Sequence, residues 1–204
     1  MRICMVNGSP KRAGGASEEL LKVLEKHLGA EHDYIRCTTA DIDPQELAEN
    51  IGNSDAAVIS FPLYSDGVPS HLLRLLLSIE TSFTESVKLY VIVNNGFYES
   101  RQDRIALDMM HLFCDRAGLE WGQGVGIGGG GMIRRGMADR PGQMKKAFRA
   151  LGVLAENITS GERKEDIYID PGIPRSLYMF GGNIGWKRMA KKNGLNSREL
   201  KEKV

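Results

Sequence analysis

The alternation of short apolar runs with longer segments of helical periodicity is the feature that most constrains how this chain can fold. Strand-like runs cover residues 2–6, 32–37, 55–61, 87–93 and 120–127. Segments with apolar residues at helical spacing follow them, as at Leu20, Leu24 and Leu28 after the first run. Because strands joined by helices pair in parallel, the pattern predicts a doubly wound α/β domain with a parallel sheet covered by helices on both faces.

The pattern changes near residue 165, where prolines and glycines replace the alternation. A chain of 204 residues can bury one substantial core. We therefore expect an α/β domain over residues 1–165 and a C-terminal extension over residues 166–204, as part of the same domain or as a dimer interface. Leu177, Phe180 and Ile184 fall on one helical stripe, so the extension is expected to contain an amphipathic helix.

Two segments offer more apolar surface than one sheet face requires. The segment 69–81 carries leucines at positions 72, 73, 75, 76 and 77, and the extension adds Phe180 and Trp186. A helix that is apolar on most of its circumference is expected between the sheet and a second surface. We expect a homo-oligomer, either a dimer or a tetramer.

Composition and charge argue against several classes of partner. The net charge is +1, and the one dense basic run, near Lys187 and Lys192, is more typical of a solvated helix face than of a nucleic-acid site. The three cysteines are widely spaced, so we expect no metal site. No signal-peptide pattern and no run of transmembrane length occurs, which predicts a cytoplasmic protein without a membrane partner.

The segment after the first strand has the composition of a phosphate-binding loop. A strand–loop–helix junction presents backbone N–H groups and the positive end of a helix to an anion. Ser9 and Ser17 add hydroxyl donors, Lys11 or Arg12 adds a positive charge, and the glycines at 14 and 15 permit close approach. The alternative is a solvated loop in which Ser17 only caps the following helix.

Of two other phosphate-loop patterns, one is absent and the other occurs at a different place in the chain. The pattern G-x-x-x-x-G-K-[ST] is absent, which argues against an ordinary nucleoside triphosphatase. The pattern G-x-G-x-x-G occurs at residues 126–131, after the fifth strand instead of the first. We expect that segment to be a flexible or closely approached loop at the carboxyl edge of the sheet, where doubly wound folds bind ligands.

Three segments, 3–21, 61–69 and 94–99, resemble the ligand loops of the NAD(P)H-dependent FMN reductase family, part of the flavodoxin-like superfamily. The resemblance implies a flavodoxin-like, five-stranded parallel sheet in the order 2-1-3-4-5. It implies that the first loop holds the FMN phosphate and that the loops after the third and fourth strands hold the isoalloxazine. Many family members carry Asn-Thr where this chain has Ala16-Ser17, so one side-chain donor is absent.

The candidate cofactor-binding residues follow from the first loop and from this resemblance. They are Ser9, Lys11, Ala16, Ser17, Pro62, Leu63, Tyr64, Asp66, Gly67, Asn95, Gly96, Phe97, Tyr98 and Gly129. Tyr64, Phe97 and Tyr98 are suited to form an aromatic wall for the ring, although packing against the core would also explain each of them. No catalytic side chain is predicted, because the cofactor carries the chemistry.

Four charged residues near these loops have two interpretations each. Asp66 either contacts a substrate or caps the following helix, and for Glu99 we favour capping of the helix near Ser100. Arg134 and Arg135 either steer the phosphates of a nicotinamide nucleotide or are solvated surface residues, which is the more common case.

The function implied by the resemblance is an FMN-dependent oxidoreductase. NADH or NADPH would deliver a hydride through FMN to a small-molecule acceptor, such as a quinone, a nitro compound or a free flavin, or to a protein acceptor. An electron carrier like flavodoxin is the main alternative, although such carriers tend to be strongly acidic and this chain is not. A flavodoxin-like interaction module without a ligand is the third.

Overall fold

The chain consists of two compact units, unit 1 (Met1–Pro171) and unit 2 (Gly172–Val204). The computed structural model describes residues 1–11, 13–139 and 142–195, and each unit is considered separately. Arg12, an alternative to Lys11 as the positive charge of the first loop, lies outside the described residues. Residues 166–171, which we expected in the extension, lie in unit 1.

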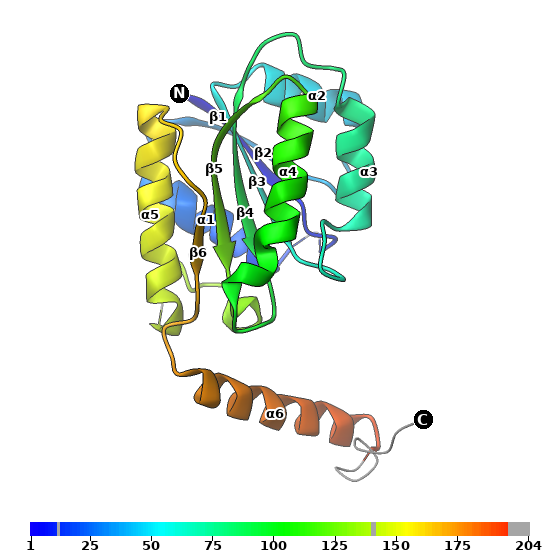
Figure 1. The fold of residues 1–204 in the computed structure, drawn as a ribbon, viewed down its shortest axis with the longest axis vertical. Coiled ribbons are helices and arrows are strands. Elements are labelled where there is room, and N and C mark those ends of the chain that lie inside the picture. Colours follow the sequence, from blue (N-terminus) through cyan, green and yellow to red (C-terminus); the bar gives the residue numbers. More distant parts are fainter. Residues whose placement is uncertain (12, 140–141, 196–204) are drawn as a thin grey trace. The chain divides into compact units, whose positions relative to one another are not determined.

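Unit 1 contains one parallel sheet in the order β2-β1-β3-β4-β5-β6 (Figure 1). Its strands are β1 (Arg2–Asn7), β2 (Asp33–Thr38), β3 (Ala56–Pro62), β4 (Lys88–Asn94), β5 (Glu120–Ile127) and β6 (Ile167–Ile169). The predicted parallel α/β architecture and the order of the first five strands are confirmed. The sixth strand was not predicted, because three residues are too few to show a period in the sequence.

The helices cover both faces of the sheet. On one face lie α1 (Ala16–Leu28) and α5 (Lys145–Ser160), and on the other lie α2 (Pro44–Gly52), α3 (Ser70–Ile79) and α4 (Arg104–Arg116) (Figure 1). Three short 3₁₀ segments, η1 (Ser100–Asp103), η2 (Gly130–Met132) and η3 (Gly142–Met144), lie between the larger elements. Two apolar clusters result, one between each face and its helices.

Local sequence signals set several helix ends. The Asp43 carboxylate accepts the N–H groups of Gln45 and Glu46 at the start of α2, where Pro44 occupies the first turn. At the end of α5, Gly161 adopts a left-handed conformation with φ of 65°. These signals fix the helix bounds and hence the lengths of the connecting loops.

The leucine-rich helix α3 is buried on one side only. Leu72, Leu75, Leu76 and Ile79 face the core, whereas Leu77 is exposed. The sheet beneath it is buried on both faces, as expected where helices cover both faces. The exposed part of α3 leaves apolar surface on unit 1, as the sequence indicated.

Unit 2 contains the helix α6 (Arg175–Lys192). The stripe of Leu177, Phe180 and Ile184 exists by helical geometry, but Met179 and Trp186 fall on the opposite side at 100° per residue. The helix therefore has apolar side chains on two opposite sides, unlike the one-sided amphipathic helix that we expected. Among the described residues, no helix combines the length and the apolar character that crossing a membrane requires.

One glycine in β5 is required by close packing. The pairing of β4 with β5 shifts register between Leu89 and Tyr90, which leaves Gly122 as the extra residue of a β-bulge. A Cβ atom on Gly122 would lie 2.4 Å from Cε1 of Tyr90. The Tyr90 ring is fully buried, and its hydroxyl donates to the carbonyl of Asn157 at 3.2 Å. The ring therefore has no room to move aside.

Gly122→Ala should lower the free energy of unfolding by about 1–3 kcal/mol, the usual cost of overpacking a core. Urea denaturation measures this value. Gly52→Ala is the matched control, because a Cβ atom on Gly52 meets nothing within 4 Å and should leave stability unchanged or slightly raised. Equal free energies for the two variants would contradict the packing argument.

Candidate functional site

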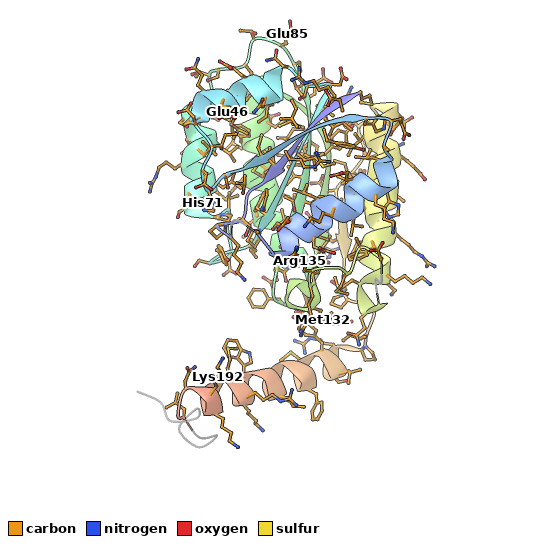
Figure 2. All side chains as sticks on the ribbon, turned by 180° about the vertical axis from the view of Figure 1, so that it is seen from behind. Glu46, His71, Glu85, Met132, Arg135 and Lys192 are labelled. Carbon is orange, nitrogen blue, oxygen red and sulfur yellow. The ribbon has the colours of Figure 1, made fainter. Side chains whose placement is uncertain are left out.

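The candidate site lies where the loops after β1, β3, β4 and β5 leave the sheet. Carboxyl ends of parallel strands meet at one edge, so these loops gather although they are far apart in sequence. Figure 2 shows Met132 and Arg135 toward this end of unit 1. The predicted ligand loops are thus neighbours in space.

Asn7 organises the loop after β1. Its side-chain oxygen Oδ1 accepts the N–H of Ser9 at 3.2 Å, and its Nδ2 donates to the carbonyl of Lys11 at 3.5 Å. The N–H of Lys11 in turn donates to Oγ of Ser9 at 3.2 Å. The loop therefore curls back on itself before α1 begins.

This curl brings Ser9 and Lys11 to the N-terminus of α1. A Cβ atom on Gly15, the N-cap residue, would lie 3.5 Å from Oγ of Ser9 and 3.7 Å from Cβ of Lys11. Gly14 has φ of 74°, which a side chain would strain. Ser9 is buried, Lys11 is exposed and Ala16 is half-buried in the first turn. The absence of a side chain at Gly15 leaves space beside the Ser9 hydroxyl and the Lys11 side chain.

Ser17 is tied to the centre of the sheet. It is buried in the first turn of α1, and its Oγ accepts a hydrogen bond from Nδ2 of Asn94 at 3.0 Å. A hydroxyl that accepts one hydrogen bond still has its own proton to donate. Ser17 therefore links α1 to β4 in addition to the anion-binding role that the sequence indicated.

Glu18, in the first turn of α1, contacts this loop and was missed by sequence reasoning. Its carboxylate accepts the N–H of Gly14, as expected for an acidic side chain in the first turn that reaches back to the preceding loop. The ion pair with Lys22 is the main cause that lowers the pKa of Glu18, and the charge of Arg135 contributes to the same direction. One loop N–H is thus already occupied by an internal carboxylate.

His71, at the start of α3, also supports the first loop. Its Nε2 lies 3.2 Å from the hydroxyl of Thr39, which donates to the carbonyl of Asn7 at 3.2 Å. Burial lowers the pKa of His71, and a hydrogen bond with the backbone of Gly8 opposes that change. The imidazole is therefore neutral at neutral pH and braces the loop without adding charge.

The loop after β3 forms a tight turn with left-handed backbone. Tyr64 and Gly67 exchange both N–H···O bonds, at 3.1 and 3.0 Å, around Ser65 and Asp66, whose φ angles are 47° and 60°. Two positive φ angles characterise a type I′ turn, which usually places glycine or asparagine there. Without glycine at either position the turn is strained, and such strain is common at ligand sites.

The predicted residues of this loop have different surroundings. Tyr64 is 47% exposed, whereas Leu63 packs against the α2–α4 side of the core and Pro62 ends β3. The N–H of Gly67 is used within the turn. Asp66 makes no capping hydrogen bond, because α3 begins after Pro69 with no side-chain cap. The capping interpretation of Asp66 is therefore wrong.

The loop after β4 repeats the arrangement of the first loop. Oδ1 of Asn95 accepts the N–H of Phe97 at 2.8 Å, and Nδ2 donates to the carbonyl of Glu99 at 3.2 Å. Phe97 is 51% exposed, Gly96 is exposed and Tyr98 is half-buried. Asn95 thus fixes the backbone that presents the exposed Phe97 ring.

Asn94 joins these loops and was missing from the predicted set. Its buried amide Nδ2 donates to Oγ of Ser17 at 3.0 Å and to the carbonyl of Phe61 at 3.1 Å. Its own carbonyl accepts the N–H of Leu63 at 2.8 Å. The available sequence signal was an asparagine directly after the apolar run of β4, as Asn7 follows that of β1.

The glycine cluster after β5 packs against the loop after β4. The N–H of Gly129 donates to the carbonyl of Phe97 at 2.6 Å, and that of Gly130 to the carbonyl of Asn95 at 2.6 Å. A Cβ atom on Gly128 would lie 2.2 Å from the carbonyl oxygen of Tyr98. The loop is closely approached, as expected, but by the chain's own backbone.

Glu19 anchors the segment that carries the two arginines. It is buried on α1, and its Oε1 accepts the N–H of Ala138 at 2.9 Å. Arg134 and Arg135 are exposed on this segment, and the charge of Arg135 acts on Glu18. Arg135 therefore adds positive potential near the first loop.

A carboxylate from the β6 segment replaces the predicted cap at Glu99. Oδ1 of Asp170 accepts the N–H and the hydroxyl of Ser100, at 2.8 and 2.7 Å. The Glu99 side chain makes no capping hydrogen bond to η1, so our preferred interpretation of Glu99 is wrong. The contact spans the sequence from residue 100 to residue 170, and no local pattern reveals it.

Asp103 is a buried carboxyl group close to this loop. Neither carboxyl oxygen has a hydrogen-bond partner of good geometry among the described residues. Burial is the main cause that raises the pKa of Asp103 to about 7, while the Asn95 amide and the Ile127 backbone lie close enough to oppose that change. A Cβ atom on Gly126 would lie 3.1 Å from Cβ of Asp103. The group therefore titrates near neutral pH inside the fold.

Asp103 should make stability depend on pH. A carboxyl group in the unfolded chain titrates at about 3.9, so between that value and about 7 only the folded state holds the proton. Rising pH in this range should cost up to about 1.4 kcal/mol of unfolding free energy per pH unit. Asp103→Asn removes this pH dependence. The free energy of unfolding of the wild-type protein minus that of the variant should therefore fall as the pH rises.

Urea denaturation at a series of pH values measures this difference. Asp108→Asn, on an exposed position of α4, the helix that directly follows Asp103, is the control and should give a difference that does not change with pH. A constant difference for Asp103→Asn would show that Asp103 titrates normally.

Comparison with known proteins identifies solved structures that share this fold. No model of a known protein family matches the sequence, and no curated protein matches it. An NADH:FMN oxidoreductase in its apo form superposes with a TM-score of 0.59 and 16% identity, covering 86% of this chain and 97% of that chain. A flavodoxin from Streptococcus pneumoniae gives 0.58 and 14%, covering 79% and 99%.

A larger protein matches over part of its length. The rubredoxin oxygen:oxidoreductase of Desulfovibrio gigas superposes with a TM-score of 0.57 and 10% identity over 78% of this chain, which spans only 35% of that protein. Identities this low establish the fold without establishing an activity. The chain has the flavodoxin-like fold.

Proposed function

We propose that unit 1 binds FMN at the carboxyl edge of the sheet and acts as an FMN-dependent NAD(P)H oxidoreductase. The observation that carries the proposal is the placement of an anion-binding loop at the start of α1 beside two adjacent loops with exposed aromatic rings. A small-molecule acceptor, such as a quinone, a nitro compound or a free flavin, or a protein acceptor would take the electrons.

The first loop fits a phosphate group. Ser9 has a hydroxyl proton with no acceptor among the described residues, and Lys11 is exposed beside it. The N-terminus of α1 adds its partial positive charge, and Arg135 adds a further charge nearby. Glu18 has to share or release the N–H of Gly14 when an anion enters, which reduces the affinity that the loop would otherwise provide.

The loops after β3 and β4 fit a planar apolar ring. Tyr64 and Phe97 are each about half exposed, and an aromatic ring system covering them would remove that surface from water. Asn95 holds the backbone of Phe97, and the glycine cluster supports that backbone through Gly129. These two residues act as positioning groups for the ring.

Bound FMN supplies both the acceptor and the donor of the hydride. The residues of this chain hold its phosphate, orient its ring and exclude water from one side of it. We assign no side chain as a proton donor to the substrate. A cytoplasmic location stays a prediction from the sequence, which gives no preference between NADH and NADPH.

An electron carrier is the second candidate. Residues 1–171 contain 19 Lys and Arg against 24 Asp and Glu, a net charge of −5 that the whole-chain value of +1 conceals. An acidic surface suits docking to a positively charged redox partner. The net charge of residues 1–171 favours an electron carrier more than the whole-chain charge does. An experiment therefore has to distinguish the carrier from the reductase.

The purified protein should be yellow and release FMN, not FAD, on denaturation, because the first loop offers one phosphate site. Lys11→Ala should weaken FMN binding about 10- to 150-fold, the equivalent of losing a charge-assisted hydrogen bond of about 1.5–3 kcal/mol. Flavin fluorescence titration measures the dissociation constant. Lys88→Ala, which removes a lysine from the amino end of β4, is the control.

Unchanged affinity in both Lys11→Ala and Ser9→Ala would move the phosphate site away from the first loop. A colourless protein that takes up no FMN at micromolar concentration would remove the central proposal.

FMN-loaded protein should be bleached anaerobically by NADH or NADPH in one two-electron step, with a stoichiometry of one nucleotide per flavin. The reason is that exposed Tyr64, Phe97 and Gly96 leave the edge of the site open to a second planar ring. Absorbance during titration with each nucleotide measures the reaction. If neither nucleotide reduces the flavin while dithionite reduces it one electron at a time, the carrier function replaces the reductase.

A further inference from the structure

One face of unit 1 exposes apolar side chains that its own core does not use. Leu77 is 55% exposed, Ile105 is 55% exposed and Leu112 is 59% exposed. Leu77 lies on α3, and the other two lie on α4, the neighbouring helix on the same face of the sheet (Figure 1). Outside the candidate site, Met1 and Val153 are the other exposed large apolar residues in the described part of unit 1. Apolar exposure is therefore concentrated on α3 and α4.

The exposed side chains of α4 form a stripe along the helix. Ile105, Met109 and Leu112 are four and three positions apart, which places them on one side. The buried residues of α4 lie on a different side, and they are Ala106, Leu107, Met110, Phe113 and Cys114. A helix that is buried along one side and apolar along a second is expected to pack on both sides.

Helix α3 extends this stripe. Nε and Nη2 of Arg116, in the last turn of α4, contact the carboxylate of Glu80, which follows α3, at 2.5 and 3.1 Å. At 100° per residue, Leu73 and Leu77 lie on the side of α3 that carries Glu80, so this side faces α4. The α3–α4 patch consists of Leu73, Leu77, Ile105, Met109 and Leu112.

Two charges beside the patch oppose the dipole of their own helix. Arg104 is the first residue of α4 and Asp115 lies in its last turn, whereas a helix favours acidic groups at its start and basic groups at its end. Arg104 is 4.0 Å from Asp108, the limit of an ion pair, and Asp115 forms no ion pair within the described ranges. Both are exposed on the same flank of the stripe. Their own helix therefore gives neither charge a good partner.

A second copy in antiparallel orientation would supply both partners. In a twofold-symmetric pair, Ile105 of one α4 would lie opposite Leu112 of the other, and Met109 would meet Met109 near the axis. Arg104 of each copy would then lie beside Asp115 of the other, which gives two attractive contacts. Parallel helices would instead bring Arg104 to Arg104 and Asp115 to Asp115. The charges of α4 are thus complementary to themselves in one orientation.

Helix α6 is a poorer occupant of this face. The charged residues around the patch are more often basic than acidic, with Arg74, Arg101, Arg104 and Arg116 against Glu80, Asp108 and Asp115. Helix α6 contains five Lys and Arg and no Asp or Glu. Positive charge on both surfaces opposes their association, whether α6 comes from the same chain or from another. A second α4 brings both signs of charge, so it fits the patch better.

We propose that the α3–α4 patch is the interface of a homodimer, in which two copies of α4 pack antiparallel about a twofold axis near Met109. The dimer is independent of the proposed flavin chemistry, because none of the candidate cofactor-binding residues belongs to the patch.

Charge reversal at the two ends of α4 tests the orientation. Wild-type protein should show twice the chain mass of 22.5 kDa in light scattering. Arg104→Asp alone, or Asp115→Arg alone, should weaken the dimer at least about 10-fold, because each brings like charges together at two contacts. Each substitution also gives its helix end the charge that the dipole favours, so both variants should stay folded, as circular dichroism checks.

Two combinations of these substitutions should restore the dimer. A chain that carries both Arg104→Asp and Asp115→Arg again brings opposite charges together, with the signs exchanged. An equimolar mixture of the two single variants should form a heterodimer, because each contact then joins unlike charges. Such rescue requires that α4 meets a second α4, and no other occupant of the patch would produce it.

Leu112→Gln tests the apolar part of the interface. It should weaken the dimer at least about 10-fold, because two leucines per dimer lose burial. Val153→Gln is the matched control, since Val153 is 49% exposed on α5, which covers the other face of the sheet. Lys145→Asp and Glu156→Arg, both exposed on α5, are the controls for charge reversal. All three controls should remain dimers.

A wild-type protein that is monomeric at every concentration tested would overturn the proposal. A dimer that persists in both single charge variants and in Leu112→Gln would place the interface on another surface. A folded double variant that stays monomeric, like a mixture that forms no heterodimer, would show that α4 does not pair with itself in this orientation.

Discussion

The buried amide of Asn94 is the contact on which the candidate site depends. Its two donated hydrogen bonds join the first turn of α1 to the end of β3, and its backbone carbonyl holds the start of the loop after β3. A shorter side chain would leave the carbonyl of Phe61 and the hydroxyl of Ser17 without this donor inside the fold, at considerable cost. One residue thus sets the spacing between the loop after β1 and the loops with aromatic rings.

Asn7 and Asn95 make the same kind of side-chain-to-backbone hydrogen bond in two of these loops. Each follows or ends a parallel strand and accepts the N–H of the residue two positions later, Ser9 in one case and Phe97 in the other. Asparagine suits this role because its short amide mimics a backbone turn. The loops are therefore held by the chain itself, and a ligand would meet a surface that is already largely formed.

Internal carboxylates add negative charge to this edge of the sheet and would oppose the binding of an anion there. Glu18 occupies a loop N–H, and Asp103 becomes charged only near neutral pH because burial opposes its ionisation. The buried Glu19 and the exposed Asp170 instead anchor the segments around Ala138 and Ser100. Acidic groups here have structural roles that their positions in the sequence do not reveal.

The sequence by itself determined the parallel α/β fold, because hydrophobic periodicity reports on burial locally. The order of the first five strands followed from the resemblance of the three ligand loops to a known family, and the structure confirms it. The sequence also placed Ser9, Lys11 and the glycines of the first loop together, since they are neighbours in the chain. Only the tertiary structure decided the strand β6, the Asn94 contacts and the cap of Ser100 by Asp170. Each of these joins residues far apart in sequence, and a single hydrogen bond across such a distance leaves no periodic pattern in the chain.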